Sequence, residues 1–84
     1  MRHARADDLT RVAGLLARLR ELDGLKEKSP GTFYRGSRAF LHFHEHDGDI
    51  ICDVRFDGTD FERRTVTSAS AQRTLVGDVR RALG

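Results

Sequence analysis

A two-residue turn at Asp47-Gly48 constrains the fold of this chain more than any other feature of its sequence. An Asp-Gly pair between segments of alternating apolar and polar residues is the strongest short-range signal for a β-hairpin. It predicts strands over residues 38–46 and 49–56. Because successive side chains of a strand point to opposite faces, the turn also predicts which residues share a face.

The predicted pairing divides this hairpin into an apolar face and a polar face. The apolar set is expected to face the core and pairs Leu41 with Val54, Phe43 with Cys52 and Glu45 with Ile50. The polar set pairs His46 with Asp49, His44 with Ile51, His42 with Asp53 and Phe40 with Arg55. A slip of one residue would bury three histidines and expose the apolar set, so the register is strongly specified.

The rest of the chain supplies two helices and two further strands. Apolar residues recur at helical spacing in two segments, and turn residues bound the strands. The expected elements are helices over residues 9–22 and 67–83, and strands over residues 32–35, 38–46, 49–56 and 61–66. We therefore expect an α+β fold, a two-layer sandwich in the order α-β-β-β-β-α. Its two helices pack on one face of a four-stranded antiparallel meander sheet.

Length and composition indicate a small folded domain. We expect one domain over residues 1–84, with residues 1–6 disordered. No apolar run reaches the roughly 18 residues that a membrane span needs, and one cysteine cannot form a disulfide framework within the chain. The expected location is therefore cytoplasmic. A formal net charge of +2 does not by itself indicate a nucleic-acid binder.

The histidines of the polar face have the spacing of a metal site. Zinc takes three or four nitrogen, sulfur or oxygen ligands in tetrahedral geometry. His42 and His44 lie at alternate positions of one strand, and Asp53 is expected directly opposite His42. The pattern is compatible with a zinc site and with adventitious capture of a transition metal. It is also compatible with a solvated face without a cofactor, on which aspartates pair with histidines across the strands.

The polar face as a whole is the expected interaction surface. Extending the alternation through the Gly36-Ser37 turn places Phe33 opposite Phe40 on this face. The surface then comprises Phe33, Arg35, Arg38, Phe40, His42, His44 and Arg55. We expect a non-catalytic interaction module that uses this surface for self-association as a homodimer or for a protein partner. The alternatives are nucleic-acid binding through stacked aromatics and arginines, and covering of the phenylalanines within the chain.

Catalytic motifs are missing from the sequence. It has no nucleophile elbow, phosphate loop, dinucleotide fingerprint or zinc-protease motif. Cys52 shares the core face with Phe43, and burial opposes the formation of a reactive thiolate. We therefore expect a structural role for Cys52 and no enzymatic activity.

Two segments carry a family resemblance. Residues 22–27 read LDGLKE and residues 33–40 read FYRGSRAF. With the preceding helix, they resemble the front half of MmcQ/YjbR-like proteins, over roughly residues 9–56. The resemblance implies a compact α+β fold and, at the level of the family, DNA binding. It assigns no site residues.

Overall fold

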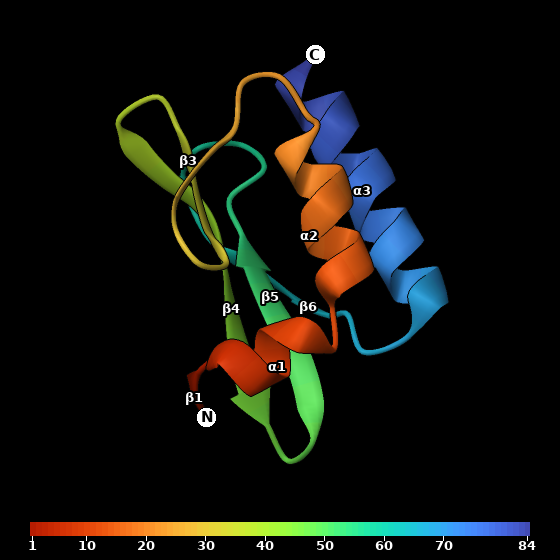
Figure 1. Ribbon diagram of the computed structural model, residues 1–84. Helices are drawn as coiled ribbons and strands as arrows, with labels where there is room; N and C mark the ends of the chain where they lie inside the picture. The colour runs from red at the N-terminus through yellow and green to blue at the C-terminus, as the bar shows by residue number, and fades with distance from the viewer.

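The computed structural model describes all 84 residues and has the expected two layers, one of antiparallel strands and one of helices (Figure 1). Along the chain the elements are β1 (Arg2–His3), α1 (Ala6–Thr10), α2 (Ala13–Arg20), β2 (Lys26–Ser29), β3 (Thr32–Arg35), β4 (Arg38–His46), β5 (Asp49–Val54), β6 (Glu62–Thr65) and α3 (Ala69–Leu83). The α+β fold predicted from the sequence is therefore confirmed. None of the helices combines the length and the apolar character that crossing a membrane requires.

The central hairpin has the predicted register. β4 and β5 pair from Leu41↔Val54 to His46↔Asp49 without a slip. Asp47 and Gly48 have φ angles of 50° and 87°, and a type I′ turn requires positive φ at both central residues. The turn thus places the histidines of β4 on one face of the sheet and its large apolar residues on the other.

A β-bulge interrupts the alternation at the start of β4. Phe33 pairs with Leu41 and Tyr34 pairs with Ala39, which leaves Phe40 as an extra residue between them. Because a bulged residue breaks the two-residue period, Phe40 and Leu41 both reach the helix side of the sheet. Phe33 is 1% exposed and Phe40 is 3% exposed, and both belong to the hydrophobic core. The prediction that these two rings face each other on the polar face is therefore wrong.

The sheet has more strands than the four predicted. β2 to β6 follow one another in order as an antiparallel meander, and the short β1 pairs with the far half of β4. β2 is not among the strands expected from the sequence, because it has no apolar alternation. It is held by Glu27, which accepts bonds from the Arg20 side chain and from the Gly31 amide.

The first residues of the chain are also part of the sheet. Arg2 and His3 form β1, where disorder was expected. Arg2 forms an ion pair of 2.6 Å with Asp8, which is largely buried, and lies 3.5 Å from Glu45. These contacts place the imidazole of His3 next to β4.

The first predicted helix is divided into two. α1 ends at Thr10 and α2 begins at Ala13, because Val12 leaves the helical region at ψ 28°. Figure 1 shows α1 crossing one end of the sheet and α2 lying beside α3. The bend lets Leu9 join the core next to Gly31 while α2 packs against α3. α3 begins at Ala69, two residues later than predicted, with the Ser68 hydroxyl accepting a bond from the Ala71 amide.

The core lies between the helices and one face of the sheet. Its members from the central hairpin are Phe40, Leu41, Phe43, Ile50, Cys52 and Val54. The opposite face of the hairpin carries His42, His44 and Asp53 and has no helix over it (Figure 1). This uncovered face, together with β1 and β6 on either side, is called the outer face below.

Candidate metal centre

Two imidazoles and one carboxylate converge on the outer face. His42 and His44 come from alternate positions of β4, and Asp53 lies opposite His42 on β5. The Nε2 atom of His44 is 3.1 Å from Oδ2 of Asp53, and that of His42 is 3.8 Å from the same oxygen. One potential ligand atom from each residue lies within 4.8 Å of the others. Ligands of a tetrahedral zinc ion are about 3.3 Å apart, so small side-chain movements would close these three residues around one ion.

Asp53 is held in place by its other oxygen. Arg63 on β6 pairs with Asp53 across the strands, and its Nε donates to Oδ1 at 3.0 Å. A second bond from the Arg63 guanidinium reaches Oδ2 at 3.4 Å. Ligating carboxylates are commonly oriented by such outer partners. Arg63 thus fixes the carboxylate with Oδ2 turned toward the imidazoles.

The environment favours the protonation states that metal ligation needs. Burial and the neighbouring His44 lower the pKa of His42, against the opposing effect of Asp53. For Asp53, burial raises the pKa, but the hydrogen bond and charge of Arg63 outweigh burial and lower it overall. At neutral pH, His42 is therefore a neutral imidazole and Asp53 is an anion. A metal ion binds these two forms without first displacing a proton.

A third imidazole lies beside the cluster. His3 pairs with His44 across β1 and β4, and the centroids of their rings are 4.9 Å apart. The His3 ring is 6.2 Å from that of His42. His3 is therefore near enough to approach a bound ion, although it is not one of the three convergent ligands. A two-residue strand carries no periodic signal, so sequence patterns could not place His3 here.

His46 extends the series of histidines but does not join the cluster. Its side chain is about half exposed and lies 3.4 Å from Asp47 in the turn. It therefore resembles His42 and His44 in residue type and strand face while differing in surroundings. This makes His46 a matched control for the other two.

An aromatic side chain borders the cluster on one side. Phe61 meets the ring of His42 edge-on, with centroids 5.0 Å apart. The guanidinium of Arg55 lies 4.2 Å from the centre of the Phe61 ring. Phe61 is also 41% exposed. Phe61 thus partly shields the cluster from solvent. Arg55, which directly follows β5, packs against Phe61.

The seven residues predicted as one interaction surface lie in three places. His42, His44 and Arg55 are near one another on the outer face. Arg35 instead extends toward α3, where its Nη1 donates to the Ala82 carbonyl at 3.3 Å. Arg38 is paired with Arg35 at the end of the β3–β4 hairpin. With Phe33 and Phe40 in the core, the predicted continuous surface is not formed.

Cys52 lies on the core side, as its strand position predicts. It is fully buried, and burial raises the pKa of its thiol well above the ordinary value. The side chains suited to bind a ligand are those of the cluster on the outer face, and Cys52 is not one of them. No family model matches the chain, and comparisons with curated proteins and with solved structures also find no match.

Proposed function

We propose that this protein is a metal-binding module that holds one divalent transition-metal ion, zinc in the first place, between His42, His44 and Asp53. The observation that carries the proposal is the convergence of these donors, with one ligand atom from each within 4.8 Å of the others. Imidazole nitrogen with carboxylate oxygen is a donor set that zinc accepts. The rigid β4–β5 hairpin supports all three side chains, which limits the rearrangement that binding would need.

Three protein ligands leave one position of a tetrahedral ion for another donor. His3 is the nearest additional imidazole, and water is the alternative. The positive charge of Arg63, which donates to both oxygens of Asp53, opposes a cation. We therefore expect an affinity below that of closed structural sites with four protein ligands.

Two other functions predicted from the sequence depend on Phe33 and Phe40 as exposed rings. Self-association would use them as apolar contact area, and nucleic-acid binding would use them as stacking platforms. Both rings are buried, whereas metal binding needs neither of them. Of the three functions, metal binding is therefore the one that agrees best with the buried positions of Phe33 and Phe40.

The test is a zinc titration of protein purified without a histidine tag, followed by calorimetry and by metal analysis after dialysis. We expect one ion per chain, with binding at least about tenfold weaker in His42→Ala and in His44→Ala. His46→Ala removes the same side chain from the same face of β4 and should bind like the unmodified chain. Equal losses in all three variants, or no stoichiometric binding, would overturn the proposal.

A further inference from the structure

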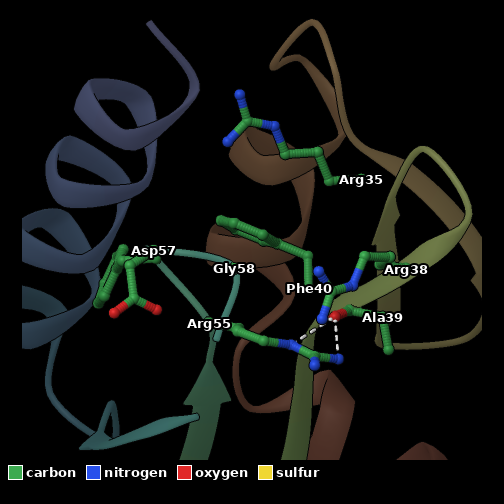
Figure 2. A pocket seen from close by; sticks show the side chains of 8 residues that line it. Arg35, Arg38, Ala39, Phe40, Arg55, Asp57 and Gly58 are labelled. Atoms are coloured by element: carbon green, nitrogen blue, oxygen red, sulfur yellow. Dashed lines mark hydrogen bonds between the residues drawn. The ribbon is translucent and has the colours of Figure 1, made fainter. Parts of the chain in front are cut away.

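A small cavity lies at the other end of the hairpin. It opens between the β3–β4 turn and the segment that follows β5, and its volume is about 130 Å³. Figure 2 shows Phe40 at its centre, with Arg35, Arg38 and Arg55 arranged around the ring and Asp57 across from them. The bulge at Phe40 turns this ring to the helix side and so supplies one wall of the cavity.

The three arginines of the cavity have no carboxylate partner. Five other arginines form ion pairs, namely Arg2, Arg20, Arg63, Arg64 and Arg81. The remaining five form none, so what distinguishes the three arginines of the cavity is that they lie together. Arg35 donates only to the Ala82 carbonyl, and Arg55 donates only to the Ala39 carbonyl, at 3.1 and 2.6 Å. Arg38 is exposed and makes no side-chain hydrogen bond. Each guanidinium has five N–H donors, so most of those donors are free for a ligand.

One carboxylate faces these cations. Asp57 accepts a bond from the Thr59 amide at 2.9 Å, and this backbone bond is the main cause that lowers its pKa. Asp57 is therefore ionised at neutral pH. Three guanidinium charges and one carboxylate charge leave two uncompensated positive charges around the cavity.

We propose that this cavity binds the phosphate group of a small phosphomonoester. A phosphomonoester carries about −1.5 to −2 charges at pH 7, which matches the two uncompensated positive charges. Guanidinium groups recognise phosphate oxygens through paired N–H bonds. The volume is well below the roughly 300–1,000 Å³ of pockets that enclose whole ligands. The phosphate therefore occupies the cavity, and the organic part lies outside it. The cavity shares Arg55, whose guanidinium lies over the Phe61 ring, with the border of the proposed metal centre. It uses none of the three proposed metal ligands, so either site can fail alone.

The experiment is a ¹H–¹⁵N chemical-shift titration of the full chain with phenyl phosphate, at low ionic strength and without phosphate buffer. We expect saturable shifts at the amides of Ala39, Phe40 and Gly58. Arg38→Gln should weaken binding about tenfold or more, since it removes charge-assisted hydrogen bonds. Arg73→Gln removes the same charge from an exposed position of α3 that forms no ion pair, and should change the affinity less than twofold.

Three results would overturn this assignment. Equal weakening in Arg38→Gln and Arg73→Gln would mean a response to overall charge. Benzoate binding as tightly as phenyl phosphate would mean a general anion site. Shifts at the same amides with a single-stranded oligonucleotide, but none with phenyl phosphate, would mean a surface for polyanions.

Discussion

The stability cost of Phe33→Ala tests the β-bulge of β4. With the bulge Phe33 is buried in the core, whereas simple strand alternation would place it on the polar face. The Phe33 ring is 1% exposed and packs in the core opposite Leu41. Removing a buried phenylalanine ring costs about 3–5 kcal/mol through lost burial and the cavity left behind. Phe61→Ala provides the comparison, because Phe61 is 41% exposed and should cost less than about 1 kcal/mol.

Urea unfolding followed by circular dichroism measures this difference. With a slope of about 1–3 kcal/mol/M for a small domain, Phe33→Ala should lower the midpoint by about 1 M or more. A domain of this size has a stability near the low end of about 5–15 kcal/mol, so Phe33→Ala could fail to fold. Phe33→Leu then replaces it, with an expected cost of about 1–1.5 kcal/mol. Costs for Phe33 no greater than for Phe61 would refute the bulge and return Phe33 to the polar face.

Two further changes test the backbone and the anchored N-terminus. Gly31→Ala should destabilise by about 1–2 kcal/mol, because φ is +76° and the new Cβ would lie 2.9 Å from Leu9 Cδ2. Gly14→Ala, which meets nothing within 4 Å in α2, should instead stabilise by up to about 1 kcal/mol, and urea midpoints distinguish the two. Arg2 and the Arg5 amide lower the pKa of Asp8 in the folded state, so the unfolded chain binds its proton more readily. The stabilisation is present above about pH 4 and is lost as the pH falls through the folded-state pKa. Thermal midpoints in this acid range should therefore vary less with pH in Asp8→Asn, and an unchanged pH dependence would contradict the ion pair.

The sequence was sufficient where local patterns determine the structure. The Asp47-Gly48 turn and the alternation beyond it predicted every pair of the β4–β5 hairpin. They also placed His42, His44 and Asp53 together, since cross-strand neighbours follow directly from the register. The amphipathic pattern of α3 was an equally local signal.

Features that depend on tertiary packing were missed. The bulge at Phe40 adds one residue to β4 without any change in composition, so alternation carried through Gly36-Ser37 reversed the face of Phe33. β2 has no apolar period, and β1 is held mainly by the contacts of Arg2. The position of His3 beside the proposed metal centre and the arginine cavity around Phe40 both arise from these missed features.

The most direct test of the metal centre observes the imidazole nitrogens themselves. Long-range ¹H–¹⁵N spectra of the histidine side chains, recorded before and after one equivalent of zinc at neutral pH, identify which nitrogens bind the ion. We expect Nε2 of His42 and of His44 to move to the shifts of metal-bound nitrogen, while the signals of His46 remain unchanged. Unchanged signals of His42 and His44, or equal changes in all the histidines, would contradict it.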